Sequence, residues 1–244
     1  RGLDLNVSIS HALMGVGSTA VLEGTAERGF LRALFRGHRG SCCLFDVGAN
    51  TGQFLRMALA EGRQHALDIH CFEPSATAFR SLSAEVAERP SLTLNNLALG
   101  REPGTATLFA DHPGSGMASL TRRTLRDAAF THAEPVQVDT LDDYCLRRAV
   151  ERIDLLKIDV EGHELDVLAG GAGMFQRRAV GTVLFEFGGP AVDTRTFFKD
   201  FYVFFQAAGM SLARLTPSGS CVPLRGYRGS YEQFRGCSLL VASR

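Results

Sequence analysis

The sequence has no surplus of charge of either sign. Lys and Arg together number 26, as do Asp and Glu, so the formal net charge is zero. A protein that binds nucleic acid through electrostatics needs excess positive charge to displace counterions. We therefore expect no nucleic acid among the partners. Arg122, Arg123 and Arg126 form a local basic group, either a solvated helix face or a site for an anionic substrate.

Long apolar runs and paired cysteines are also missing. No stretch approaches the roughly 20 uninterrupted apolar residues that span a bilayer, and segment 1–22 lacks the compact apolar core of a secretory signal. None of the six cysteines stands in a C-x-x-C pair, and most lie in apolar runs, so we interpret them as reduced core residues. This indicates a reducing, cytoplasmic location. Because the chain starts with Arg1, we expect a trimmed chain or part of a longer protein.

The sequence has no internal repeat, low-complexity tract or linker, and its 244 residues suit a single α/β domain. From about residue 42 onward, short apolar runs alternate with helical patterns, which is typical of βαβ units and a doubly wound parallel sheet. Residues 1–40 lack strand signals and are predicted to form a helical N-terminal extension on the catalytic core 41–244. The predicted strands are 43–47, 69–72, 92–97, 105–109, 136–138, 153–158, 182–187, 211–215 and 237–241.

Four helical features accompany these strands. A helix with Phe79, Leu82 and Val86 on one face is expected to stop before Pro90. Thr140 is expected to begin a helix, with Asp143 completing a capping box. A further helix is expected around residues 165–168, and the aromatic-rich helix 197–205 is expected to be core rather than an acceptor pocket.

The most informative stretch runs from Phe45 to Phe54, where a buried strand leads through small residues into a helix. Nucleotide-like ligands bind at such crossovers, because the backbone can approach the ligand and the helix N-terminus offers free N–H groups. Gly48, Ala49 and Gly52 supply small or permissive residues, and Asn50 tolerates left-handed dihedral angles. We predict that this turn, Gly48, Ala49, Asn50 and Gly52, binds a cofactor.

Two carboxylates accompany the turn. Asp46 near the end of the first strand is costly to bury without a partner, unless it merely caps the turn. Glu73 follows the second strand, 21 residues after Gly52, close to the spacing of about 20 residues at which an acid binds both ribose hydroxyls. Together they predict a cofactor that contains adenosine. NAD is the alternative, disfavoured because the turn lacks the G-x-G-x-x-G order.

Titratable residues follow two later strands. Asp159, Glu161 and His163 come after strand 153–158, and Glu186 lies in strand 182–187. Because parallel strands end at one edge of the sheet, these four are the acid–base candidates. Asp159 has the better expected position, whereas His163 has the more suitable ordinary pKa. A Mg²⁺ ion held by Asp159, Glu161 and Glu186 is an alternative. The loop with His112, Ser115 and Ser119 either closes over the substrate or is an exposed connection.

The motifs resemble those of the FkbM family of S-adenosylmethionine-dependent methyltransferases, from residue 42 to about 190. The matching segments are FDVGANTGQF (45–54), CFEPS (71–75), NNLALG (95–100), VDTLDDY (138–144), LLKIDVEGHELDVLAGG (155–171) and VLFEF (183–187).

The resemblance implies a class I methyltransferase fold, Rossmann-like, with about seven strands and the last one antiparallel. It implies that Asp46, Gly48, Asn50 and Glu73 contact S-adenosylmethionine, with Asp46 reaching its ammonium and Asn96 bordering the adenine. It also implies methylation of a hydroxyl oxygen on a small-molecule or glycan acceptor, a sugar or a secondary metabolite. A silent cofactor-binding module remains an alternative, and the acceptor and oligomeric state stay open.

Overall fold

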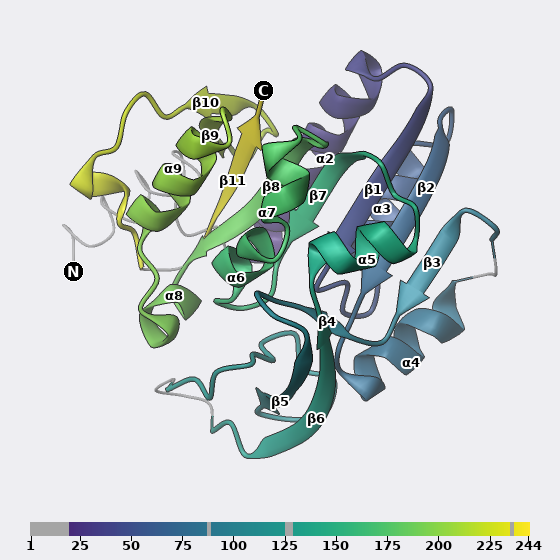
Figure 1. Cartoon of the computed structure of the whole chain (residues 1–244), viewed down its shortest axis with the longest axis vertical. Coiled ribbons are helices and arrows are strands. Elements are labelled where there is room, and N and C mark those ends of the chain that lie inside the picture. The colour runs from purple at the N-terminus through teal and green to yellow at the C-terminus, as the bar shows by residue number, and fades with distance from the viewer. Residues whose placement is uncertain (1–19, 87–88, 125–128, 235–236) are drawn as a thin grey trace.

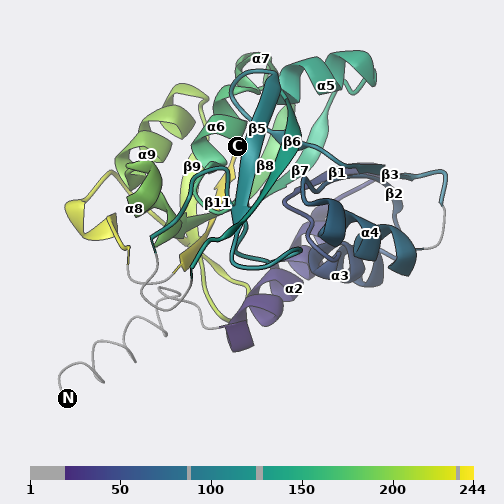
Figure 2. The ribbon, with the colours of Figure 1, turned by 90° about the horizontal axis from the view of Figure 1, so that it is seen from below.

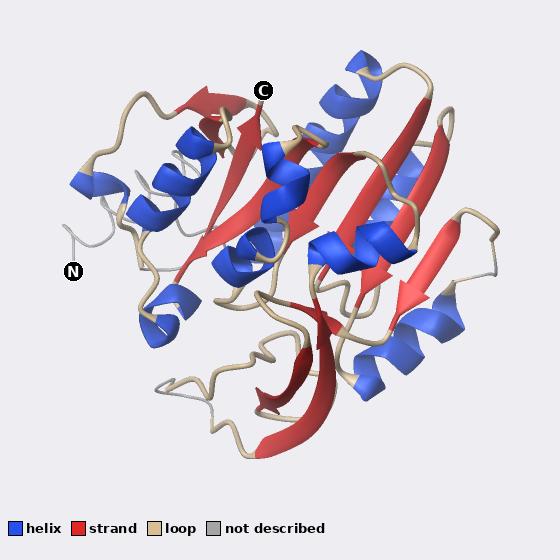
Figure 3. Cartoon of the chain, viewed as in Figure 1, coloured by secondary structure: helices blue, strands red, loops and turns tan. Residues whose placement is uncertain are grey.

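The chain folds around a twisted, mostly parallel sheet with helices on both faces (Figures 1 and 3). The computed structural model describes residues 20–86, 89–124, 129–234 and 237–244. Within them, the main sheet has eight strands in the order β10-β9-β11-β8-β7-β1-β2-β3. These strands are β1 (Ser41–Val47), β2 (Ala66–Phe72), β3 (Leu92–Asn95), β7 (Ile153–Ile158), β8 (Val180–Gly188), β9 (Ser211–Leu215), β10 (Cys221–Pro223) and β11 (Cys237–Ser243).

Pairing within this sheet agrees with the predicted fold. Strands β3, β2, β1, β7 and β8 run parallel, whereas β11 pairs antiparallel with β8 and with β9. The doubly wound sheet and the antiparallel last strand are confirmed. The edge strand β10 was not predicted; it pairs with β9.

Two buried clusters of side chains, one on each face of the sheet, form the core. Side chains alternate between the faces along a strand, so Phe45 of β1 joins one cluster and Leu44 the other. The helices of the first cluster are α5 (Leu141–Arg147), α6 (Glu164–Ala169), α7 (Ala172–Gln176) and α9 (Phe198–Ala207), with α8 (Pro190–Thr194) beside them. The helices of the second are α2 (Ala20–Gly37), α3 (Gln53–Glu61) and α4 (Ala76–Glu85).

Several predicted helices are found where expected. The Thr140 side chain accepts a hydrogen bond from the backbone of Asp143 at 3.1 Å and begins α5. The aromatic helix α9 buries Phe198, Phe201 and Phe205 in the core. Helix α4 ends at Glu85, one residue short of the expected Val86.

A second, three-stranded sheet at the carboxyl ends of β1 and β2 was not predicted as a separate unit (Figures 1 and 2). The expected strand 92–97 is shorter in the structure, because β3 ends at Asn95. The next strand, β4 (Ala98–Leu99), lies outside the main sheet and pairs with β6 (His132–Asp139). Strand β5 (Gly104–Ala110) pairs antiparallel with β6. A short 3₁₀ turn, η1 (Gly229–Tyr231), precedes β11. This small sheet stands beside the edge at which the predicted site residues emerge.

The N-terminal prediction is met in part, because residues 1–19 lie outside the described ones. Helix α2 packs on the sheet through Phe30, Leu31 and Phe35. No described helix combines the length and apolarity that a membrane crossing requires. Cys42, Cys71 and Cys145 are buried as expected, but Cys221 is exposed on the edge strand β10, which corrects its assignment to the core.

Candidate active site

The carboxyl ends of β1, β2, β7 and β8 bring the predicted residues to two adjoining cavities. The inner cavity lies between the ends of β1 and β2, the small sheet and loop 111–124. The outer cavity extends from the same turn toward α2 and α3. Residues that line both cavities are Gly48, Asn50, Gly116, Asp159 and Glu161.

The turn after β1 is tied to β2 by backbone hydrogen bonds. The N–H groups of Gly48 and Ala49 both donate to the carbonyl of Phe72, at 2.9 and 3.0 Å. Asn50 has the left-handed conformation expected for it, with φ 47°. Gly52 has φ 86° and begins α3, but it lines neither cavity. The turn therefore presents Gly48, Ala49 and Asn50 to a ligand, while Gly52 sets the direction of the helix.

Glu73 closes one side of the inner cavity with its buried carboxylate. One oxygen accepts the N–H of Asn50 and the other the N–H of Ser75, both at 2.8 Å. Burial raises the pKa of Glu73 to about 7, although these two hydrogen bonds oppose the shift. Each oxygen retains a lone pair for a further donor, so this carboxylate can accept two ligand hydroxyls.

Asn96 does not line either cavity. Its side-chain amide donates to the carbonyls of Glu73 and Pro74, at 2.9 and 3.0 Å, so it fixes the turn after β2. The neighbouring Leu97 and Ala98 line the inner cavity instead. The expected adenine-bordering role therefore suits these two residues better than Asn96.

Asp46 has a partner within the protein. It is fully buried, and Lys157 of β7 places its ammonium nitrogen 3.2 Å from Oδ1. The same ammonium lies 3.4 Å from a carboxylate oxygen of Asp159. Burial alone would lower the pKa of Lys157, but the carboxylates of Asp46 and Asp159 outweigh it and raise this pKa. Asp46 lines neither cavity, and Lys157 is its nearest cation among the described residues.

Glu161 is held by a basic residue of loop 111–124. Arg123 donates to its carboxylate at 2.5 Å, and the Ser119 hydroxyl donates to its backbone carbonyl at 2.8 Å. Burial raises the pKa of Glu161 to about 8, with the charge of Asp159 adding to the effect and Arg123 opposing it. The Arg123 side chain is buried, which corrects the prediction of a solvated helix face for this residue. Arg126 lies outside the described residues.

His163 lines the inner cavity but not the outer one. Its Nε2 lies 3.0 Å from the Thr121 hydroxyl and its Nδ1 lies 2.9 Å from a carboxylate oxygen of Asp166. Both ring nitrogens therefore have protein partners, one of them on loop 111–124. Ser115 and Ser119 of that loop line the inner cavity, whereas His112 does not. The loop covers the cavity, and His163 and Glu161 anchor it.

The outer cavity contains residues that the sequence analysis missed. Glu27 and Arg28 reach it from α2, and Cys237 of β11 lies in it beside the predicted Glu186. Helix α2 carries no motif, so no sequence signal pointed to Glu27 or Arg28. Lys157 was also missed, although a lysine inside the apolar run 153–158 is itself a signal, because lysine is almost never buried without a charged partner.

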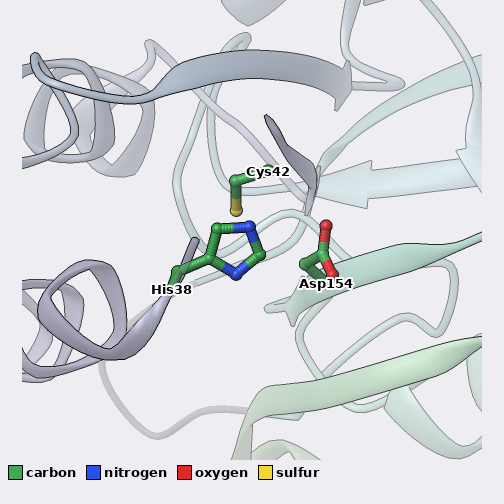
Figure 4. Close-up of side chains that lie close together, drawn as sticks. All are labelled: His38, Cys42 and Asp154. Carbon is green, nitrogen blue, oxygen red and sulfur yellow. The ribbon is translucent and has the colours of Figure 1, made fainter. Parts of the chain in front are cut away.

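The three residues of the magnesium alternative all line the outer cavity, but they do not form a group whose ligand atoms lie close enough to share an ion. Among the described residues, the groups that could hold an ion are His38, Cys42 and Asp154 (Figure 4), and Cys43, Asp68 and His70. His38 and Asp154 lie at the amino ends of β1 and β7, away from the cavities. There, His38 Nε2 bonds the Ser41 carbonyl, and Asp154 accepts from Arg152 and from the backbone of Cys43. The arrangement of Asp159, Glu161 and Glu186 thus gives no support to the magnesium alternative.

Residues 46–212 match the model of the methyltransferase FkbM domain. This chain belongs to the FkbM methyltransferase family. The match spans every predicted site residue and the whole lining of the inner cavity, whereas the outer cavity is also lined by Glu27, Arg28 and Cys237 from outside the matched range. The protein is therefore an S-adenosylmethionine-dependent methyltransferase, and the oxidoreductase alternative is set aside.

Two curated relatives support the assignment. The chain is 30% identical over 189 residues to the 31-O-demethyl-FK506 methyltransferase FkbM of Streptomyces tacrolimicus, an alignment that covers 67% of this chain and 72% of that one. It is 29% identical over 142 residues to the 2-O-methyltransferase NoeI of Sinorhizobium fredii, covering 52% of this chain and 56% of that one.

A solved structure supports the fold. The crystal structure of methyltransferase FkbM from Methylobacillus flagellatus KT matches with a TM-score of 0.52 and 14% identity, covering 84% of this chain. The matched region spans 44% of that longer chain.

The inner cavity of this FkbM domain fits S-adenosylmethionine. Apolar side chains form a wall suited to a flat base, and the Glu73 carboxylate could accept hydrogen bonds from ribose hydroxyls. At Gly48 an added Cβ would lie 1.8 Å from the carbonyl oxygen of Asp159, so the turn comes as close to its neighbours as only glycine allows. The apolar residues of the wall are Val47, Phe72, Leu97, Leu99 and Leu108.

Proposed function

We propose that this methyltransferase acts on a hydroxyl oxygen of a small molecule, a sugar or a secondary metabolite, with Asp159 as the base. The observation that supports this most is the position of Asp159. Its half-exposed carboxylate lines both cavities, where a ligand in the inner one and an acceptor in the outer one would meet. The names of both relatives, FkbM and NoeI, also specify an oxygen as the methylated atom.

The chain's residues take separate parts in this reaction. S-adenosylmethionine supplies an activated methyl group on its sulfonium when bound. Glu73 would accept the ribose hydroxyls, and the turn Gly48–Asn50 would hold the methionine end. As the methyl carbon leaves sulfur for the acceptor oxygen, Asp159 would take the hydroxyl proton, because a protonated ether is a poor product. Alignment of acceptor and donor contributes the remaining rate enhancement.

Other titratable residues are less suited to be the base. The Glu161 carboxylate is bound by Arg123, and both nitrogens of His163 are engaged. Glu186 lines the outer cavity and remains a candidate contact for acceptor hydroxyls. Unlike Asp159, it does not line the inner cavity.

A labelled-donor screen tests the acceptor class. Purified protein is incubated with S-adenosylmethionine carrying an isotopically labelled methyl group and with metabolite extracts, and labelled products are identified by mass spectrometry. We expect the label in an O-methyl ether. A product labelled on nitrogen or carbon contradicts the proposal. In parallel, S-adenosylhomocysteine should raise the melting temperature and NAD should not; stabilisation without any labelled product favours the silent module.

Cofactor affinity is expected to depend on pH through Glu73. Its pKa of about 7 in the free protein means that the carboxyl is largely protonated below pH 7. A bound ribose donates its hydroxyls to the ionised form, so binding should release a proton near neutral pH. Affinity for S-adenosylhomocysteine should fall by up to about tenfold for each pH unit below 7 and level off above it.

Calorimetric titrations between pH 5.5 and 8.5 would measure this dependence. Glu161 titrates in a similar range, with a pKa of about 8, so a control variant is needed. Glu73→Gln should bind more weakly and lose the slope below pH 7. If the affinity of Glu73→Gln still falls below pH 7, the titrating group is a residue other than Glu73.

A further inference from the structure

A buried lysine lies beneath the point where the two cavities meet. Lys157 is the penultimate residue of β7, and its side chain is only 7% exposed. Its ammonium nitrogen has three oxygen neighbours: the Asp46 carboxylate at 3.2 Å, the Asp159 carboxylate at 3.4 Å and the Gly48 carbonyl at 3.2 Å. The ammonium donates a hydrogen bond to the Gly48 carbonyl and forms ion pairs with the two carboxylates.

Neutralising Asp46 does not by itself explain this arrangement. A buried ion pair is often no more stabilising than two well-packed apolar side chains of similar volume. The other two oxygen neighbours, on Asp159 and Gly48, suggest another role for Lys157, because both residues belong to the active site. Gly48 is part of the cofactor turn, and Asp159 lines both cavities.

We propose that Lys157 is a positioning residue for methyl transfer, which holds the Asp159 carboxylate in a fixed place relative to the Gly48 turn. The proposal rests on the proposed function, because it has a catalytic meaning only if Asp159 takes the acceptor proton. Lys157 lines the outer cavity but not the inner one. It acts through Asp159 and Gly48, each of which reaches both cavities.

The surrounding charges define what the loss of this ammonium would do. Asp46 on β1, Glu27 on α2 and Glu73 after β2 all act electrostatically on Lys157 or are acted on by it. Asp159 interacts electrostatically with Asp46, Glu161 and Glu164. Without Lys157, the Asp159 carboxylate would face these three acidic groups with no ammonium beside it, so repulsion would displace it from its place next to the Gly48 turn.

A pair of variants separates positioning from simple charge neutralisation. Asp46→Asn removes the buried carboxylate and leaves Lys157 with Asp159 and Gly48. Asp46→Asn combined with Lys157→Met removes both charges, so that no unpaired buried charge remains. If Lys157 only neutralises Asp46, the two variants should behave alike. If it positions Asp159, the double variant should be impaired well beyond Asp46→Asn.

The primary measurement needs no acceptor. In protein labelled with carbon-13 at aspartate carboxyls, the Asp159 signal is identified by its loss in Asp159→Asn. At neutral pH its chemical shift should differ between the double variant and Asp46→Asn, because the ammonium beside this carboxylate has been removed. With an acceptor from the labelled-donor screen, turnover of the double variant should fall by about tenfold relative to Asp46→Asn, because the carboxylate is no longer held in place.

The control variant is Leu156→Ala, on the same strand but with its side chain in the opposite core cluster. It should lower the melting temperature without changing the Asp159 chemical shift. If the double variant does not fold, Asp46→Asn with Lys157→Gln carries the same prediction.

An Asp159 signal at the same chemical shift in the single and double variants overturns the proposal. Full turnover of Asp159→Asn instead contradicts the proposed function, whatever the chemical shift shows.

Discussion

Replacing Gly48 with alanine is expected to abolish cofactor binding. The residue has φ 82°, and an added Cβ would lie 1.8 Å from the carbonyl oxygen and 2.8 Å from the carbonyl carbon of Asp159. Both are backbone atoms, so no side-chain rotation can relieve the clash. Either the turn or the segment after β7 must move, and both line the two cavities. We expect affinity for S-adenosylhomocysteine to fall below calorimetric detection.

A second glycine provides the control for this substitution. Gly209 also has a positive φ, of 67°, but an added Cβ there meets nothing within 4 Å. Gly209→Ala therefore has only the cost of a left-handed alanine, about 1–2 kcal/mol, which should lower the melting temperature by several degrees and leave cofactor binding intact. If Gly48→Ala binds as tightly as Gly209→Ala, the cofactor does not depend on this turn.

The fold was largely predictable because apolar periodicity specifies buried strands. The predicted strands 153–158 and 211–215 agree with β7 and β9 at both ends. The small sheet was not predictable as a unit. Strand β4 is two residues long, and its partner β6 lies far along the chain. Local sequence patterns do not specify such non-local pairing. The sequence therefore predicts one strand, 92–97, where the structure ends β3 at Asn95.

The site was predictable to the extent that strand ends determine it. Gly48, Asn50, Glu73 and Asp159 follow parallel strands, and such strands end at the same edge of the sheet. The charge partners were harder to predict. Arg123 belongs to a loop whose path depends on the small sheet, and nothing in its local sequence distinguishes a buried arginine from a solvated one.

Asp159→Asn is expected to reduce turnover by about 10²–10⁴-fold, the usual contribution of a positioned acid or base. The amide has nearly the same shape and can still accept a hydrogen bond from Lys157, so cofactor affinity should change by only a few-fold. Steady-state methyl transfer at saturating S-adenosylmethionine, with calorimetry for binding, measures the two effects separately. Raising the pH should not restore the variant, because asparagine has no carboxylate to ionise.

His163→Gln is the matched comparison for this prediction. Glutamine can bond Thr121 or Asp166 but not both, so the anchor of loop 111–124 weakens while the junction of the cavities keeps its carboxylate. We expect at most about a tenfold loss, chiefly through weaker cofactor binding. The reverse order, with His163→Gln inactive and Asp159→Asn near full turnover, would make the histidine the base. In that case a proton would have to be taken from the inner cavity, because His163 does not line the outer one.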